Sequence, residues 1–224
     1  MKNKQHPNSK SNQLVRRFIA GLAALMLFHF VGCDENSQLE QTTLSRAKLA
    51  EIDDQFARGQ IDQADSSLND YLKQFPDSYQ GWALKGWINV RRGNLAEAEK
   101  LFRKVLQLNP TWDNAYVGLG VVARKSNRDE QARKYYLKAI ELSANNAEAY
   151  SSLVLLEIKA HNIDKAIDYG ERAYSISPLN PSIAANLCWA YHLHGDDKNR
   201  DKYFEIAERL QYSGLEALKQ RLAD

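Results

Sequence analysis

"YQGWALKGWINVRRGNLAEAEKLFRKVLQLNP", residues 79–110, contains two short amphipathic segments on either side of a turn signal. Small or aromatic residues recur four positions apart, at Trp82 and Gly86 in the first segment and at Ala98 and Phe102 in the second. Side chains at this spacing lie on one face of an α-helix. Gly93, between the segments, permits the left-handed conformation with which many helices end. The stretch therefore predicts two helices joined by a tight turn.

The same pattern recurs along most of the chain with a period of 34 residues and no insertion. The column of the turn residue reads Gly59, Gly93, Asn127, His161 and Gly195. Five residues later the column reads Ala64, Ala98, Ala132, Ala166 and Arg200, and four residues after that it reads Leu68, Phe102, Tyr136, Gly170 and Phe204. Units of this kind bury their apolar faces only by stacking on neighbours, so the period predicts a stacked array.

These columns resemble the tetratricopeptide repeat (TPR), most fully in residues 79–110. The resemblance implies an all-α fold, namely a right-handed α-solenoid of about five helix-turn-helix repeats. The repeats are expected at 45–78, 79–112, 113–146, 147–180 and 181–212. In the remaining segment, 213–224, Ser213 and Glu216 have the spacing of a capping box and three leucines share one helical face, which predicts a C-terminal capping helix.

Glycines inside the predicted helices indicate where neighbouring helices approach closely. Gly86 and Gly120 occupy the same column of successive repeats. Glycine inside a helix costs about 1 kcal/mol relative to alanine, which is reasonable where another side chain needs the space. Gly170 instead removes an aromatic residue from an internal repeat, and the sequence offers no reason for it.

Residues at the junctions between repeats are suited to begin helices. The N-cap candidates are Asp77 or Ser78, Thr111, Asn145 or Asn146, and Asn180, which precedes Pro181. Their side-chain oxygens can accept hydrogen bonds from the free N–H groups of a first turn, and proline is tolerated at the first helical position. We therefore predict that a helix begins directly after each of these residues.

The first 32 residues form a predicted signal peptide. Five basic residues and no acidic residue precede the apolar run Phe18–Gly32, which is fifteen residues long. A transmembrane helix needs roughly 20 apolar residues, and this run is shorter and contains His29. A basic segment followed by a short apolar segment therefore favours a cleaved signal over a membrane span.

The segment "FVGC", residues 30–33, resembles the lipobox of bacterial lipoproteins. The resemblance implies a diacylglycerol on the Cys33 sulfur, cleavage before Cys33 and acylation of the new amino terminus. Asp34 resembles the signal that retains lipoproteins in the inner membrane, facing the periplasm, rather than in the outer membrane. Residues 33–44 then form a lipidated, polar tether. An ordinary cysteine beside an uncleaved anchor is the alternative.

The charge of the chain depends on this processing. The full sequence carries a net charge of +2, but without the five basic residues of the signal peptide 25 Lys and Arg face 28 Asp and Glu, a net charge of −3. The mature chain has no excess of positive charge, so no nucleic-acid partner is expected. With Cys33 lipidated, Cys188 has no cysteine with which to form a disulfide.

By resemblance, the partner-binding groove is the concave face, lined by positions two, five, nine and twelve of each first helix. Position nine reads Asp53, Trp87, Val121, Leu155 and Trp189, and position twelve reads Phe56, Val90, Arg124, Ile158 and His192. An exposed face this apolar predicts a protein-binding surface. The alternative is that tight winding or the tether buries it, so that Trp87 and Trp189 serve only as packing groups.

A basic cluster accompanies the apolar face at the ends of consecutive first helices: Arg91, Arg92, Arg124, Lys125 and Lys159. Basic residues favour helix C-termini because of the macrodipole. The other interpretation is a rim that receives an acidic peptide or an anionic glycan. The predicted groove comprises Trp87, Val90, Arg91, Val121, Arg124, Lys125, Leu155, Ile158, Lys159 and Trp189.

The sequence offers no set of residues for catalysis, for a cofactor or for a metal. His192 and His194 are two residues apart, hence on different sides of a helix and poorly placed to share a metal. The glycines occupy fixed positions of the repeat and do not form a phosphate-binding loop. Cys188 occupies the column of Gly86 and Gly120, which predicts a buried, unreactive thiol. We therefore expect that the protein is not an enzyme.

Position five of the repeats reads Leu49, Ala83, Val117, Ser151 and Ala185, without the lysine of the carboxylate clamp in chaperone-binding TPR domains. A cytosolic co-chaperone role is therefore unsupported. The resemblance implies a membrane-anchored periplasmic scaffold that binds a partner peptide or helix and assists assembly of pilus, secretion or polysaccharide-export machinery. The alternative is a glycan-binding subunit of polysaccharide export, in which Trp87 and Trp189 stack on sugar rings. The partner, the assembly and the oligomeric state are left open.

Overall fold

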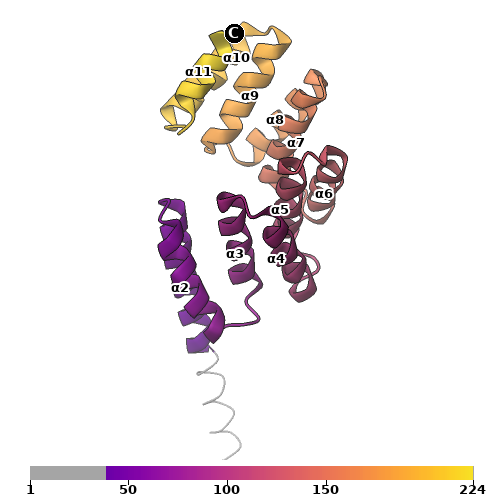
Figure 1. Ribbon diagram of the computed structural model, residues 1–224. Helices are drawn as coiled ribbons and strands as arrows, with labels where there is room; N and C mark the ends of the chain where they lie inside the picture. Colours follow the sequence, from indigo (N-terminus) through magenta and orange to yellow (C-terminus); the bar gives the residue numbers. More distant parts are fainter. Residues whose placement is uncertain (1–38, 224) are drawn as a thin grey trace, which may run out of the picture. The chain divides into compact units, whose positions relative to one another are not determined.

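The computed structural model describes residues 39–223, and this part of the chain is helical without any strand (Figure 1). A first helix covers residues 39–57. It is followed by α2 (Ile61–Gln74), α3 (Tyr79–Arg92), α4 (Leu95–Leu108), α5 (Asp113–Lys125), α6 (Asp129–Leu142), α7 (Ala147–Lys159), α8 (Ile163–Ile176), α9 (Pro181–His194), α10 (Asp197–Arg209) and α11 (Leu215–Ala223). The predicted all-α fold is confirmed. The predictions for the signal peptide, Cys33 and Asp34 lie outside the described residues.

The chain divides into two compact units, Met1–Asp54 and Gln55–Asp224. Helices α2 to α11 all belong to the second unit, which contains the repeats discussed below.

Helices α3 to α10 form four pairs, each made of two helices that a short turn joins and that pack against each other. The first helices of these pairs, α3, α5, α7 and α9, also contact one another in sequence. The second helices α4, α6 and α8 pack against the first helix of their own pair and that of the next pair. Because successive first helices touch one another while successive second helices scarcely do among the described pairs, the first helices form the inner row of a helical-repeat solenoid (Figure 1).

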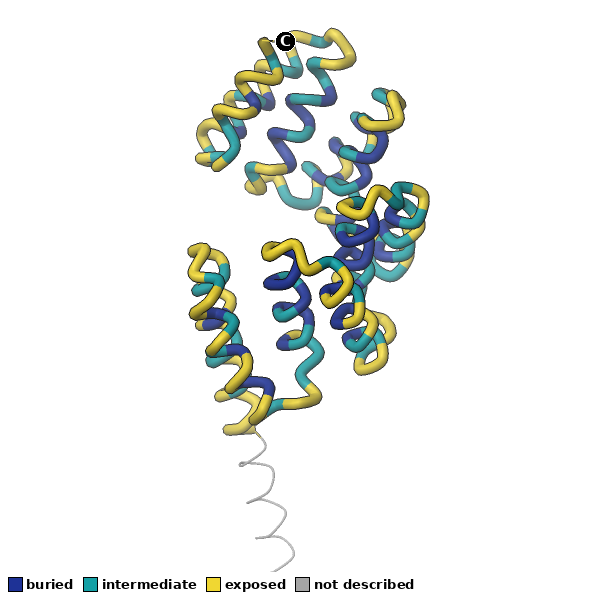
Figure 2. Tube along the Cα trace, in the orientation of Figure 1, coloured by how far each residue is buried: buried dark blue, intermediate teal, exposed yellow. Residues whose placement is uncertain are grey.

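Burial follows the same division. In Figure 2 the buried residues run along the inner helices α3, α5 and α9, whereas the turns between helices are exposed. The most deeply buried large side chains include Phe102 of α4 and Tyr136 of α6, both 0% exposed. Phe102 and Tyr136 of the aromatic column therefore point into the interface between the two rows, whereas Phe204 of the same column is only partly buried.

The turn column adopts the predicted left-handed conformation in every repeat. The backbone φ is positive at Gly59, Gly93 and Gly195, and also at Asn127 (57°) and His161 (58°). Asparagine and histidine both occur in this region more often than most other residues with a side chain. Gln211 (58°), after α10, is a further left-handed residue that the repeat pattern did not predict.

Three of the predicted N-caps are confirmed and one is wrong. The side chains of Ser78, Asn146 and Asn180 accept hydrogen bonds from the first turns of α3, α7 and α9. For α5 the N-cap is Trp112, and no side chain caps it. Thr111 fails in this role because the Asn109 side chain takes both its backbone N–H and its hydroxyl, at 3.3 and 3.1 Å.

The glycines of the inner helices make room for the rings of the outer helices. A Cβ on Gly86 would lie 2.9 Å from the ring of Phe102, and a Cβ on Gly120 would overlap the ring of Tyr136. The expected close approach is therefore present, and each glycine faces the aromatic residue of its own repeat.

Gly170 is explained by the same close approach, but here the small residue lies on the outer helix and the larger residue on the inner helix. In this repeat the inner helix carries Val154 where the two preceding repeats carry Gly86 and Gly120. A Cβ on Gly170 would lie 2.6 Å from Leu187 and 3.6 Å from Val154. Leu187 of the next repeat thus fills the space that an aromatic ring occupies elsewhere, and the outer helix must supply the small residue.

Helix α11 covers the last pair. Leu218 is 4% exposed and packs with Ala184, Cys188 and Tyr203 of α9 and α10. The helix begins at Leu215, so Gly214 and not Ser213 occupies the capping position. The carboxylate of Glu216, expected in a capping box, instead accepts a hydrogen bond from Lys219 at 3.0 Å.

Candidate functional site

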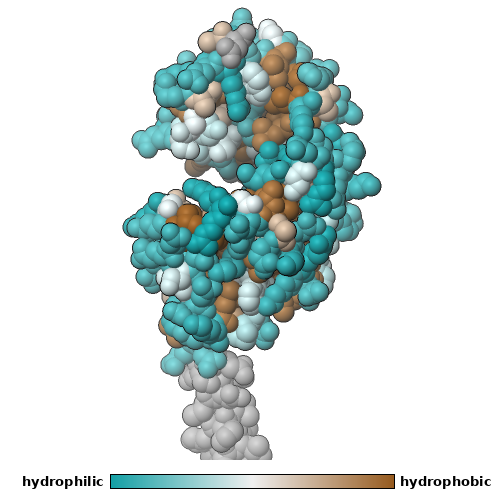
Figure 3. Space-filling view, viewed as in Figure 1, coloured by the Kyte–Doolittle hydropathy of each residue, from teal (hydrophilic) through white to brown (hydrophobic). Residues whose placement is uncertain are grey.

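An open hollow of about 460 Å³ lies on the inner row of helices. Its lining comes from four helices: Phe56, Trp87, Val90, Arg91, Lys125 and Glu148. Trp87, Val90 and Arg91 belong to α3, Lys125 ends α5, and Glu148 lies in the first turn of α7. Four of the ten residues predicted for the groove are thus brought together here. The surface in Figure 3 is mostly hydrophilic and is interrupted by apolar patches.

The apolar side chains of the hollow are anchored from below. The ring of Trp87 meets the buried ring of Phe102 edge to face, with centroids 5.2 Å apart. Val90 is 8% exposed and packs in the same cluster. The guanidinium of Arg91 lies over the ring of Phe56, 5.7 Å from its centroid. The rings of Trp87 and Phe56 therefore pack on other residues and each still faces solvent in part.

The other predicted apolar residues are partly buried along the same row and do not line the hollow. Val121 packs against the clusters around Phe102 and Tyr136. Ile158 packs against Val154 and its neighbours, and Leu155 is likewise half-buried. The residues of this face therefore pack against the clusters beneath them and also keep solvent contact.

Trp189 is separated from Trp87 along the array. Its ring stacks on His192, with centroids 5.3 Å apart, and Arg221 of α11 lies 6.0 Å from its centroid. It also packs against the cluster formed with α10 and α11. Both neighbours and the capping helix give Trp189 a packing role at the end of the solenoid.

Two of the predicted basic residues belong to contacts between repeats. Arg92 at the end of α3 binds Asp62 and Asp65 of the preceding helix α2, at 2.6 and 2.7 Å. Lys159 at the end of α7 binds Asp129 of α6 at 2.5 Å. Each pair joins the acidic start of an outer helix to the basic end of the next inner helix, which also suits both macrodipoles.

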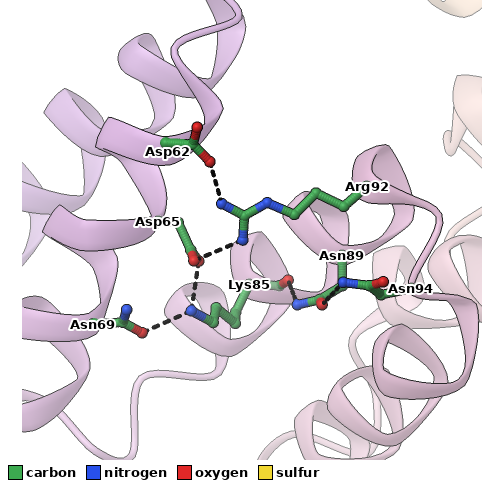
Figure 4. Close-up of polar contacts among 7 residues, drawn as sticks. All are labelled: Asp62, Asp65, Asn69, Lys85, Asn89, Arg92 and Asn94. Carbon is green, nitrogen blue, oxygen red and sulfur yellow. Dashed lines mark hydrogen bonds and ion pairs between the residues drawn. The ribbon is translucent and has the colours of Figure 1, made fainter.

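Figure 4 shows the most extensive of these contacts, between α2 and α3. Asp65 accepts from Lys85 at 2.5 Å as well as from Arg92, and Lys85 also binds Asn69 at 2.7 Å. Burial alone would raise the pKa of Asp65, but the hydrogen bonds and charges of Lys85 and Arg92 outweigh it and lower the pKa. The network therefore stabilises an ionised Asp65.

Arg91 and Lys125 behave differently. Both are exposed, and neither forms a salt bridge with any residue of the part of the chain that the structure describes. They face the hollow beside its apolar floor. Of the five predicted basic residues, these two are the ones available to a ligand in the hollow.

Arg124 precedes Lys125 but does not line the hollow. Its Nε atom and the hydroxyl of Tyr136 are buried, with no hydrogen-bond partner among residues 39–223. Burial raises the pKa of Tyr136, and the charge of Arg124 partly opposes this, so the two groups are neighbours. Arg124 is therefore turned partly into its own repeat.

Phe56 and Glu148 line the hollow but are not among the ten predicted groove residues, and only Phe56 stood in a column that the sequence analysis spelled out. The protein atoms crowded around Glu148 raise its pKa by desolvation, although its side chain keeps access to solvent. It occupies position two of the fourth repeat, which faces the groove by resemblance to the family. Reading position two of each repeat, in addition to positions nine and twelve, would have identified Glu148.

Nothing in the described residues 39–223 assembles a group of three or more metal-ligating side chains. His192 stacks on Trp189, while His194 lies 3.4 Å from Asp164. Cys188 is 0% exposed, and burial raises the pKa of its thiol to about 11. Between residues 39 and 223 no helix has the length and apolar character that a membrane crossing requires.

The paired helices that stack along the chain define a repeat protein of the TPR class. Over residues 53–211 the sequence matches the family of the "Cilia and flagella-associated protein 70 middle TPR-like domain", and the chain belongs to this TPR-like family. No curated protein matches the sequence.

Several solved structures share the fold. A thermophilic TPR protein of Thermus thermophilus is 18% identical, with a TM-score of 0.68, 80% of this chain covered and 97% of that chain. PilF of Pseudomonas aeruginosa is 19% identical, with a TM-score of 0.63 and coverages of 80% and 82%. PilW, described as a widely conserved type IV pilus biogenesis factor, is 20% identical, with a TM-score of 0.61 and coverages of 75% and 77%. At these identities the likeness concerns the fold.

Proposed function

We propose that this protein is an envelope scaffold that binds a partner peptide or helix in the hollow of its inner row. The observation that carries the proposal is the hollow itself, where an apolar floor of Trp87 and Val90 adjoins two cations without salt-bridge partners in the described part of the chain. Interaction surfaces characteristically combine a rigid aromatic anchor with a polar rim. Val121, Leu155 and Ile158 extend this face along the inner row.

We further propose that Cys33 carries the lipid anchor and that Asp34 keeps the protein on the periplasmic side of the inner membrane. The proposal is supported by the basic and apolar segments before Cys33. Two or more acyl chains give stable anchoring, because each buried methylene contributes about 0.8 kcal/mol. Anchoring raises the effective concentration of a bound partner at the membrane. Assembly of pilus, secretion or polysaccharide-export machinery is a role in keeping with it.

The groove is tested by photo-crosslinking in living cells. A crosslinking amino acid replaces Lys125 in the hollow or, as a matched control, the exposed Lys134 on the outer helix α6. We expect one dominant protein adduct from position 125, absent from position 134 and lost in a folded Trp87→Ala variant. Equal adducts from both positions, or none from position 125 and its neighbours, would contradict the proposal.

Tryptophan fluorescence distinguishes the peptide-binding proposal from the glycan-binding alternative. Trp87 and Trp189 already have ring partners, Phe102 and His192, which favours the peptide. If the partner is a peptide, purified envelope oligosaccharides should leave the tryptophan fluorescence unchanged. Quenching that Trp87→Ala removes would favour the glycan instead.

The anchor is tested by metabolic labelling with a radioactive fatty acid and by membrane fractionation. We expect label and membrane association in the wild type and neither in Cys33→Ser. Asp34→Ser should move the labelled protein to the outer membrane. Unlabelled wild-type protein would refute the lipid anchor, and wild-type protein in the outer membrane would refute the sorting role of Asp34.

A further inference from the structure

The cations of the hollow differ from the other basic residues at repeat junctions. Arg92 and Lys159 stand at equivalent helix ends and are each held by a carboxylate of the preceding outer helix. Between these two junctions, Arg128 in the turn after α5 forms a salt bridge with Glu99 of α4 at 2.8 Å. Arg91 and Lys125 have no such partner within the described part of the chain, and they flank one hollow.

We infer that Arg91 and Lys125 bind a carboxylate side chain of the partner segment, while an adjacent apolar side chain of that segment lies on Trp87 and Val90. The inference rests on the proposed function and specifies the chemistry of its ligand. Charge complementarity selects the occupant, because two cations without salt-bridge partners among residues 39–223, beside an apolar floor, fit an acidic residue next to an apolar one.

The geometry suits a carboxylate in particular. The ring of Phe56 under Arg91 restrains the guanidinium, whose planar fork matches a carboxylate with two parallel hydrogen bonds. Lys125 adds a point charge from the neighbouring repeat. Because Trp87 and Val90 exclude water from one side, these contacts are stronger than they would be on an open surface.

Glu148 limits how acidic the partner segment can be. It lines the same hollow but lies beyond ion-pair distance of Arg91 and Lys125, since no salt bridge joins these described residues. A second acidic residue of the ligand would meet this carboxylate and be repelled. The site therefore takes a single acid flanked by apolar residues, and a run of acids is disfavoured.

The experiment compares two fluorescent peptides on the full-length chain in detergent micelles. Both carry the core Leu-Phe-X-Leu-Phe, in which X is aspartate in one and asparagine in the other. By fluorescence anisotropy we expect roughly tenfold tighter binding of the aspartate peptide at low salt, from charge-assisted hydrogen bonds. This preference should shrink as salt is added.

Variants locate the effect. Arg91→Gln and Lys125→Gln should each abolish most of the preference, whereas Lys134→Gln on α6 should retain it. Glu148→Gln should tighten binding of the aspartate peptide a few-fold, because it removes a like charge. Equal affinity for the two peptides, no binding of either at about millimolar concentration, or loss of preference in the control would overturn the inference. Weaker binding of the aspartate peptide to Glu148→Gln would do so as well, since it would show that Glu148 does not repel an acidic ligand.

The outcome for the ligand chemistry is separable from that for the function. A dominant crosslinked partner at position 125, together with equal affinity for both peptides, would leave the scaffold function standing and reject the carboxylate site. Absence of any crosslinked partner would count against the scaffold function whatever the peptides show.

Discussion

At the scale of single residues, the fold depends on pairs of small and large side chains that face each other across each repeat. Gly86 and Gly120 receive the rings of Phe102 and Tyr136. At Gly170 the small residue has moved to the outer helix, because Leu187 fills the space from the next repeat. Each pair is sensitive to one added carbon, since protein interiors are close-packed.

We predict that Gly170→Ala destabilises the protein by about 1 kcal/mol. Overpacking against Leu187 costs roughly 1–3 kcal/mol and outweighs the gain of about 1 kcal/mol in helix propensity. In a Leu187→Ala background the same change should be neutral or stabilising, because the obstructing side chain is absent. Urea unfolding followed by circular dichroism measures the double-mutant cycle. Additive effects of the two substitutions would show that Gly170 and Leu187 do not compete for space.

At the scale of helices, salt bridges join the end of an inner helix, or the turn that follows it, to the preceding outer helix. Arg92, Arg128 and Lys159 all reach back to acids of that helix. A further salt bridge, with a buried carboxylate, joins Arg133 of α6 to Glu157 of α7. Asn162 also donates a hydrogen bond to the Glu157 carboxylate, at 2.9 Å. The chain thus uses most of its junction charges for packing.

We predict that Asp65→Asn lowers the free energy of unfolding by about 1–3 kcal/mol at neutral pH, because Lys85 and Arg92 lose their shared acceptor. The pKa of Asp65 is lower in the folded protein than its ordinary value. The stabilisation by ionised Asp65 is therefore fully present above about pH 4, where the carboxyl is ionised in the unfolded chain as well. This stabilisation is lost as the pH falls through the pKa that Asp65 has in the folded protein. The difference in urea midpoint between wild type and variant should be largest at pH 7 and should shrink toward pH 2.

The control for this prediction is the exposed pair of Asp70 and Lys73, at 2.8 Å on the surface of α2. Asp70→Asn should leave the urea midpoint nearly unchanged, because both groups are well solvated. An equal loss in the two variants would indicate that the network of Figure 4 contributes no more than a surface pair.

At the scale of the whole array, each helix pair is stabilised only by its contacts with adjacent pairs. The last pair, α9 and α10, therefore depends on the capping helix α11. Leu218 of α11 covers Cys188 and Tyr203, and Trp189 packs at the edge of the same cluster. Exposed apolar faces at the end of a solenoid favour fraying, which a capping helix prevents.

We predict that Leu218→Ala costs about 2–4 kcal/mol, since it removes a buried leucine from the terminal cluster. The loss should be local. Amide hydrogen exchange in α9 and α10 should accelerate, while α3 and α4 remain protected as in the wild type. The Cys188 thiol, unreactive while its pKa is held at about 11, should become accessible to a thiol reagent. Uniform acceleration along the chain would show instead that the repeats unfold as one cooperative block.

Local patterns in the sequence were sufficient for the class of fold, the turn positions and three helix starts. These features depend on neighbours within a few residues, such as Asn146 capping its own helix or Gly93 ending α3. Thr111 and Ser213 were wrong because competing hydrogen bonds and the true helix start depend on local geometry that residue type alone does not specify.

The period, the turn residues and the sizes of the facing side chains act within each repeat, so the residues alone were enough to predict a stack of TPR units. Which basic residues pair with acids and which face the hollow depends on how one repeat packs on the next. This packing turned Arg92 and Lys159 to acids on the preceding helix and left Arg91 and Lys125 at the hollow with Glu148. The physical reason is distance along the chain: Asp62 and Arg92 are 30 residues apart, so their pairing exists only when one repeat packs on the next.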